Sequence, residues 1–187
     1  MNRRPPEHWQ SRVAAELRGD GIPVEHPQLP DPDTPRLEGW IDVALDGLRC
    51  MPTGERVVAC HSLSCLLWAH LAPCLERAER PERVCWVAPP GPAVLAGEAA
   101  IADFGLPEPD AEAIRASSTA HPLRLVWSDR DPYCEEGAGP AYGEPLGLDA
   151  EFLPGQAHLN PDAGYGDWPA MTAWCLDGAS RFRRGRP

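Results

Sequence analysis

The sequence predicts an α/β fold with a mostly parallel sheet flanked by helices. Three short apolar runs have the length and composition of buried parallel strands, at residues 56–60, 83–90 and 123–128. Segments with helical spacing of apolar residues lie between and around these runs. Strands that alternate with helices along a chain are typical of parallel sheets. The length of 187 residues suits one domain, so we expect a single α/β-hydrolase-like domain over residues 1–187.

The first half of the chain is expected to form two helices ahead of the first buried strand. Residues 7–18 carry apolar side chains at four-residue spacing, as on one face of a helix. Residues 21–27, GIPVEHP, are expected to form a short strand. A second helix is predicted within residues 31–48, where Pro35 suits the first helical turn. After the first buried strand, residues 63–76 are expected to be helical.

The second half of the chain has one long segment without a clear pattern. Residues 91–121 mix Gly, Pro, Ala and Asp around one expected helix near 108–116, and they form either a cap or lid or only a loop. Residues 149–154, DAEFLP, predict a fourth and weaker strand. Residues 167–178 predict a closing helix with an apolar face.

Composition excludes several classes of protein. The formal net charge of −11 argues against a nucleic-acid partner, because phosphate binding needs a basic face. No signal peptide follows the start MNRRPPEHWQ, and no window approaches 18 apolar residues, so we expect a cytoplasmic protein with no membrane partner. The seven cysteines have no C-x-x-C pair and are expected to be reduced, with Cys60 and Cys85 packed in the core. No His, Cys and carboxylate set has the spacing of a metal site.

Polar side chains with catalytic potential follow three of the predicted strands. Ser62 follows the first strand, Asp129 and Asp131 follow the strand at 123–128, and His158 follows the weak fourth strand. Since functional groups of open α/β sheets gather beyond the carboxyl ends of the strands, we expect these side chains to meet. The order Ser, Asp, His is that of the α/β-hydrolase triad.

The chemistry of acyl transfer accounts for these residue types. Serine is a weak nucleophile and needs an adjacent base to remove its proton. Histidine titrates near neutrality and serves as that base, and an aspartate fixes its tautomer and stabilises the imidazolium. The peptide N–H that follows the serine, here that of Leu63, is expected to donate to the oxyanion.

Five segments give the sequence a resemblance to a known family: EHWQSR, ACHSLSCLLWAH, RVCWVAPP, WSDRDPYC and GQAHLNPDAGYGDWP. Together they resemble the small serine hydrolases grouped with retinoblastoma-binding protein nine and bacterial YdeN, over about residues 7–178. The resemblance implies that Ser62 is the nucleophile, that Asp131 before its proline is the acid, and that His158 is the base. Asp129 is the rival acid.

Two departures from the family pattern affect the expected activity. Cys60 and Ser64 replace the glycines of the usual G-x-S-x-G turn, and their small size keeps a tight turn sterically possible. In addition, MNRRPP precedes EHWQ in place of the apolar strand and glycine-rich loop of the family, so one oxyanion donor is expected to be lacking. The nucleophile strand would then have an unpaired edge, which pairing by GIPVEH or by another subunit would cover.

The sequence therefore predicts a serine hydrolase that cleaves a small ester, thioester or amide through an acyl-enzyme, with no cofactor and with activity impaired by the missing segment. The alternative is a weak or inactive pseudo-hydrolase that binds a ligand or a protein through the same cleft. A third possibility is that the hydrolase fold serves acyl transfer. The protein is also a possible homo-oligomer. Considered alone, Ser62 would be a helix cap, and His61 a packing or hydrogen-bonding neighbour. His8 and Trp9 are expected on a core-facing helix side, with the lining of the pocket as the alternative.

Overall fold

The computed structural model describes residues 5–106 and 108–182. Its centre is a four-stranded sheet in the order β1-β2-β3-β4, and all three neighbouring pairs are parallel. The strands are β1 (Val57–His61), β2 (Arg83–Val87), β3 (Arg124–Trp127) and β4 (Asp149–Phe152). The predicted α/β class with a parallel sheet is confirmed. Because all three pairs are parallel, the carboxyl ends of all four strands lie at one edge of the sheet. The order makes β1 a terminal strand.

Helices connect and flank these strands. They are α1 (Trp9–Gly19), α2 (Leu37–Cys50), α3 (Leu63–Leu71), α4 (Pro92–Gly97), α5 (Ala111–Arg115), α6 (Glu144–Leu146) and α7 (Pro169–Asp177). Short 3₁₀ turns occupy Ala72–Cys74, Ala102–Phe104 and Pro161–Ala163, and a π-helical turn at Gly139–Gly143 leads into α6. In the described ranges, no helix has both the length and the apolar character needed to cross a membrane.

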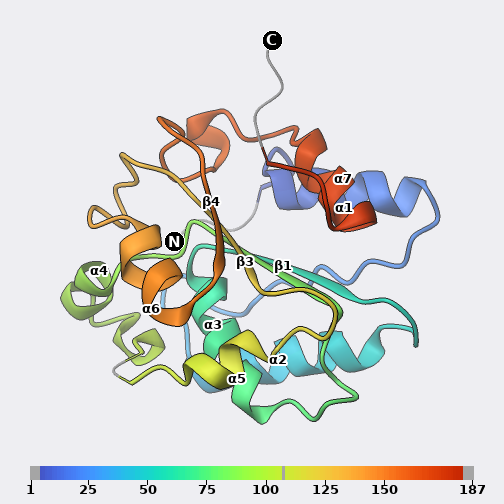
Figure 1. Ribbon diagram of the computed structural model, residues 1–187, viewed down its shortest axis with the longest axis horizontal. Helices are drawn as coiled ribbons and strands as arrows, with labels where there is room; N and C mark the ends of the chain where they lie inside the picture. Colours follow the sequence, from blue (N-terminus) through green and yellow to red (C-terminus); the bar gives the residue numbers. More distant parts are fainter. Residues whose placement is uncertain (1–4, 107, 183–187) are drawn as a thin grey trace.

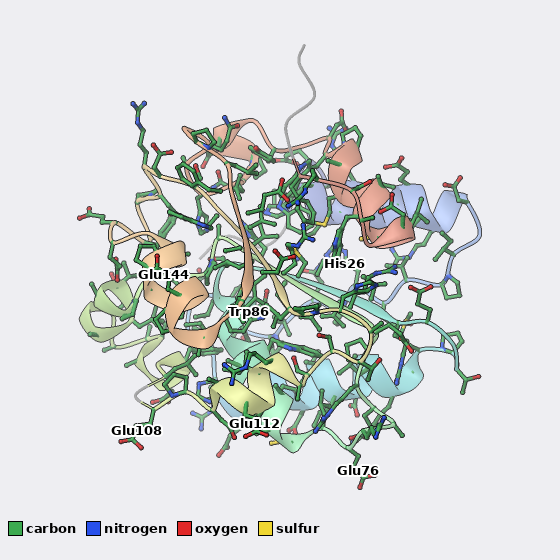
Figure 2. All side chains as sticks on the ribbon, in the orientation of Figure 1. His26, Glu76, Trp86, Glu108, Glu112 and Glu144 are labelled. Atoms are coloured by element: carbon green, nitrogen blue, oxygen red, sulfur yellow. The ribbon has the colours of Figure 1, made fainter. Side chains whose placement is uncertain are left out.

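The helices form one layer on each side of the sheet. Figure 1 shows α1 and α7 together on one side, with α2, α3 and α5 on the other. Side chains of β2 alternate between the two layers: Val84 and Trp86 belong to the apolar cluster with α2 and α3, whereas Cys85 and Val87 belong to the cluster with α1 and α7. Trp86 lies in the interior in Figure 2, as expected for a strand that is buried on both faces.

Three local expectations differ from the structure. Residues 22–27 form no strand, because they have no ladder with β1 or any other described strand. The second helix begins at Leu37, with Arg36 as its N-cap and no side-chain cap bond. The helical segment at 139–146 was not expected, since its glycines and prolines are typical of a loop.

The core on the α2–α3 side sets the stability of the sheet. Leu125 of β3 is fully buried within it. We expect Leu125→Ala to lower the free energy of unfolding by about 2–5 kcal/mol, because the change leaves a cavity where contacts were. Urea denaturation measures this loss. Leu176→Ala, at a side chain that is 51% exposed, is the control and should change stability by less than about 0.5 kcal/mol; equal losses for the two variants would contradict this account of the core.

Candidate active site

Ser62 lies on the sharp turn between β1 and α3. Its backbone has φ 56° and ψ −131°, a strained conformation for a residue other than glycine. Its N–H donates to Val87 O at 2.9 Å, so the pairing with β2 continues through the serine before the helix begins. This is the geometry of a nucleophile elbow, which exposes a side chain at the carboxyl edge of the sheet.

The residues that replace the glycines of this turn are accommodated in two ways. Cys60 is buried and directed into the apolar core between β1 and the helices beneath it. The Ser64 hydroxyl accepts a hydrogen bond from His61 N at 2.9 Å and donates one to His61 O at 2.7 Å. Ser64 therefore braces the turn through its hydroxyl group, a contact that glycine cannot make. The expectation that a tight turn is sterically possible agrees with this geometry.

Asp131 and His158 meet across the loops that follow β3 and β4. His158 Nδ1 lies 3.0 Å and 2.9 Å from the two carboxylate oxygens of Asp131. Asp131 is only 3% exposed and His158 only 6%. Asp131 Oδ1 also accepts a hydrogen bond from Tyr133 N at 2.9 Å, which fixes the carboxylate within its turn.

This contact decides which nitrogen of His158 carries the proton. An ionised carboxylate only accepts hydrogen bonds, so Nδ1 is the protonated nitrogen. Nε2 of the neutral ring then has a free lone pair and is available as a base. A buried Asp–His pair with this tautomer has the arrangement that general-base catalysis requires.

Asp129, the rival acid, bonds to the loop backbone and not to the histidine. Its carboxylate accepts a hydrogen bond from Gly155 N and one from Ser128 Oγ. The bond from Gly155 N is the main cause that lowers the pKa of Asp129. Ser128 Oγ in turn accepts from Gln156 N at 2.7 Å. Asp129 and Ser128 thus join the β3 loop to the β4 loop, and so help to place Asp131 opposite His158.

Ser62 and His158 line the same cavity, which has a volume of about 990 Å³. His61 supports this site: its Nε2 lies 2.9 Å from His158 O, so the ring donates to the backbone of the histidine loop. Tyr133, 48% exposed, places its ring 4.5 Å from that of His158 at the cavity wall. Residues of α4 and the following turn, within the segment considered as a lid, also line the cavity.

His8 is a wall residue for which the sequence left two alternatives, a core-facing helix side and the lining of the pocket. It is the N-cap of α1, is buried, and lines the cavity with Ser62. Its Nδ1 accepts from Gln10 N at 3.2 Å, and its ring lies 5.0 Å from that of His61. Trp9 is buried in the core as expected.

The Ser62 hydroxyl and the His158 ring are the two groups that a general-base reaction would join. Among the hydrogen bonds of the described residues, none joins the Ser62 hydroxyl to the His158 ring. Such bonds are often long in sites without substrate and tighten when substrate binds. The Leu63 N–H, at the first position of α3, is one of the helix N–H groups without an intrahelical acceptor and faces the same turn. The structure therefore brings Asp131 to His158 and places Ser62 in the same cavity.

Four of the seven cysteines are poor nucleophiles because burial disfavours their thiolates. Burial raises the pKa of Cys65 and of Cys85 well above the usual value, and it raises the pKa of Cys134 and Cys175 to about 12. We expect iodoacetamide at pH 8 to alkylate the native protein only at the exposed Cys50 and Cys74, because the thiolate is the reactive form. Peptide mass mapping checks this, with protein unfolded in urea as the control. Rapid alkylation of a buried cysteine in the native protein would show that the core opens readily.

A metal centre has no support in the described ranges, where no group of His, Cys, Asp or Glu has the arrangement to hold an ion. The site is defined instead by a parallel α/β sheet, a strained serine at a strand–helix turn and a buried Asp–His pair on the next loops. These features define an α/β-hydrolase-like protein.

Comparison with known proteins identifies the family to which the chain belongs. The family model described as serine hydrolase matches residues 1–175, and the chain belongs to this family. The structure of the ydeN gene product from B. subtilis is similar, with a TM-score of 0.72 and 18% identity over 89% of this chain and 87% of that one. A putative YdeN-like hydrolase from Pectobacterium atrosepticum has a TM-score of 0.63 and 21% identity over 90% of this chain and 80% of that one. A search of curated proteins found no match.

These comparisons confirm the predicted kinship with the YdeN-type serine hydrolases. Family membership supports a hydrolase function of the serine hydrolase kind. The structural likeness, at 18% and 21% identity, shows the fold.

Proposed function

We propose that this protein cleaves a small ester, thioester or amide through an acyl-enzyme formed on Ser62. The observation that carries the proposal is the buried Asp131–His158 pair in the loops beside the strained Ser62 turn. Membership in the serine hydrolase family supports it independently. The cavity of about 990 Å³ that Ser62 and His158 share has the size of a small-molecule site.

Each step of this reaction has a group in the site. His158 Nε2 takes the hydroxyl proton of Ser62 as Oγ attacks the substrate carbonyl carbon. The imidazolium, stabilised by Asp131, then gives that proton to the leaving alcohol, thiol or amine as the scissile bond breaks. In the second half, a water molecule loses a proton to His158 and attacks the acyl carbon, which releases the acid and restores Ser62. The Leu63 N–H donates to the oxyanion in both halves.

A pseudo-hydrolase is the second candidate, and one observation favours it. In the part of the chain that the structure describes, Leu63 N–H is the evident oxyanion donor and no glycine-rich loop lies across from it. Loss of one donor lowers kcat by about 10²–10³. We therefore propose that turnover is slow even if Ser62 is reactive. A covalent probe that reacts with the serine and needs no turnover therefore separates a slow hydrolase from a pseudo-hydrolase.

Covalent labelling tests the nucleophile directly. We expect a fluorophosphonate probe to modify the native protein once, with the added mass on the peptide that contains Ser62. Ser62→Ala should remove the label, because it removes the hydroxyl that His158 would activate. Ser64→Ala is the matched control, since it removes the neighbouring hydroxyl and leaves Ser62; it should keep the label, although labelling should be slower because the turn loses its two bonds to His61. Intact-mass and peptide mass spectrometry read the result.

Two outcomes decide between the candidates. Equal labelling of the wild type and of Ser62→Ala would show that another group reacts. Absence of label from a wild-type protein with native circular dichroism would favour the pseudo-hydrolase.

A further inference from the structure

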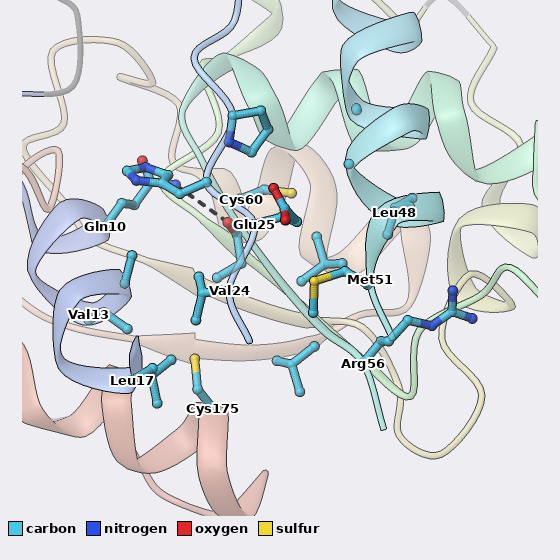
Figure 3. Close-up of a pocket in the computed structure, with 18 of the residues that line it drawn as sticks. Gln10, Val13, Leu17, Val24, Glu25, Leu48, Met51, Arg56, Cys60 and Cys175 are labelled. Carbon is cyan, nitrogen blue, oxygen red and sulfur yellow. Dashed lines mark hydrogen bonds between the residues drawn. The ribbon is translucent and has the colours of Figure 1, made fainter. Parts of the chain in front are cut away.

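A second cavity lies outside the catalytic site, along the free edge of β1. It has a volume of about 410 Å³, and its lining is mostly apolar. Figure 3 shows Val13 and Leu17 of α1 with Cys175 of α7 on one side of it, and Leu48 of α2 with Met51 on the other. The cavity therefore lies between the two helix layers, at the position beside β1 where a further strand of the sheet would fit.

The backbone of β1 is directed into this groove at alternate residues. Ser62 N donates to Val87 O and Arg83 N donates to Arg56 O, so the even-numbered residues of this stretch bond to β2. In a parallel ladder, the residues between them direct both their N–H and C=O groups to the opposite side. His61, Ala59 and Val57 thus face the free edge.

Side chains form hydrogen bonds with this edge near the carboxyl end of β1. Ser64 Oγ satisfies both backbone groups of His61, at 2.9 Å and 2.7 Å. Gln10 Nε2 donates to Ala59 O over a long 3.4 Å (dashed in Figure 3). Within residues 5–106 and 108–182, no hydrogen bond of the structure reaches Ala59 N or the backbone groups of Val57. These groups are spaced as one strand presents them to the next.

The segment 22–27 runs past the groove without pairing with β1. Its backbone bonds go elsewhere: Ile22 N donates to Leu17 O, and Val24 O accepts from the Arg18 guanidinium. Glu25 projects its carboxylate over the apolar lining near Cys60 (Figure 3). No ion pair of the described residues includes this exposed carboxylate. Arg56 lines the groove at the start of β1, so the negative charge that the groove offers is confined to the end beside Glu25 and Cys60.

We propose that this groove binds an extended segment of a separate protein, which adds along β1 as a fifth strand. Strand addition to a free sheet edge is a common mode of peptide recognition. The two helix layers require apolar side chains on both faces of the segment, and Glu25 requires one basic side chain. The net charge of −11 favours a basic partner further.

The backbone groups exclude a hydrocarbon chain as the occupant. A lipid tail would fill the apolar volume but would leave the N–H of Ala59 and the groups of Val57 buried without hydrogen bonds, which is costly. A peptide strand would supply those hydrogen bonds to the free edge of β1. The occupant is therefore a peptide strand.

Binding of a synthetic peptide tests the proposal. The probe is a set of fluorescein-labelled octapeptides of alternating valine and leucine with one arginine, moved through the central positions. We expect saturable fluorescence anisotropy with the full chain for at least one member. N-methylation of the alternate amides that face β1 should weaken that binding about tenfold or more, whereas methylation of the other set should leave it unchanged. Absence of saturable binding for the whole set, or equal effects of both methylations, would overturn the proposal.

A matched pair of glycine variants tests the location. Gly47 of α2 lines the groove, and a side chain there starts in ordinary contact, 3.7 Å from Pro27 Cγ. Gly47→Leu should fill the groove and weaken peptide binding about tenfold or more. Gly39→Leu, in the same helix with open space around it, should bind like the wild type. Both variants replace a helical glycine with a better helix former, so both should fold.

Further measurements test how the peptide binds and what occupies the groove. Glu25→Gln should weaken the arginine peptides and leave a version with norleucine for arginine unaffected. Hydrogen exchange of the Ala59 amide should slow when the peptide binds. A folded Gly47→Leu protein with wild-type affinity, or unchanged exchange at Ala59, would overturn the site. A stable dimer in sedimentation without peptide, lost in Gly47→Leu, would show that a second copy is the occupant and overturn the proposed partner.

Discussion

Replacing His158 by alanine is expected to lower kcat for hydrolysis of a short p-nitrophenyl ester by about 10⁴-fold or more. The expectation follows from the proposed function, in which the Asp131 contact keeps the proton on Nδ1 of His158 and Nε2 acts as the base toward Ser62. Without that base, the serine hydroxyl must lose its proton to water while it attacks. Initial rates over a range of ester concentrations give kcat and KM separately, and KM should change little, because the imidazole acts in the proton transfer.

Two histidine variants provide the comparison. His121→Ala removes an exposed histidine remote from the cavity and should keep the wild-type rate. His61→Ala removes the donor to His158 O and should have an intermediate effect, because it loosens the loop while the base remains. A His158→Ala protein that is folded and hydrolyses the ester at the wild-type rate would show that His158 is not the base.

The sequence was sufficient to predict the sheet because three of its strands are short, apolar and bounded by turns. Val84, Cys85 and Trp86 follow one another without a polar residue between them, and the structure buries all of them. A strand that is buried on both faces leaves few alternatives for its residues. The same reasoning explains why the positions after the strands were informative: parallel strands direct all their carboxyl ends to one edge, so Asp131 and His158 were expected to meet before any distance was known.

The local errors have a common physical cause, which is competition for backbone hydrogen bonds. Residues 22–27 contain Pro23 and Pro27, which lack N–H donors, and Arg18 takes the carbonyl of Val24. The segment therefore cannot form a ladder, although its composition resembles a strand. The missed helix at 139–146 is stabilised by tertiary packing: Tyr142 is buried and donates to Pro90 O at 2.7 Å. A contact between residues that are 52 positions apart cannot be predicted from a local sequence pattern.

The sequence favoured Asp131 over Asp129 through the family resemblance, since Asp131 directly precedes Pro132 and Asp129 lies earlier in the turn. A backbone dihedral angle explains how the structure separates the two aspartates. In the structure, Arg130 has φ 57°, and this left-handed residue turns the chain between them. Asp131 is thereby buried against His158, whereas Asp129 points to the backbone of the β4 loop. An arginine with a left-handed backbone conformation is uncommon and could not be predicted from the sequence.

The two aspartates are expected to differ strongly when each is changed to asparagine. In Asp131→Asn, the amide group can donate to Nδ1, which favours the tautomer with the proton on Nε2; that ring cannot accept the serine proton, and kcat should fall by about 10⁴-fold. In Asp129→Asn, the side-chain oxygen still accepts from Gly155 N, so the loops stay joined and kcat should fall by less than about tenfold.

Ester hydrolysis and thermal unfolding, measured on both variants, separate chemistry from folding. Asp129→Asn is the matched control, since it removes the same charge two residues away. We expect the melting temperature of Asp131→Asn to stay within a few degrees of the wild type, because the asparagine has the same shape and retains a hydrogen bond to the ring. If the larger loss of kcat falls on Asp129→Asn, the acid is Asp129, and the contact between Asp131 and His158 serves only to hold the loop.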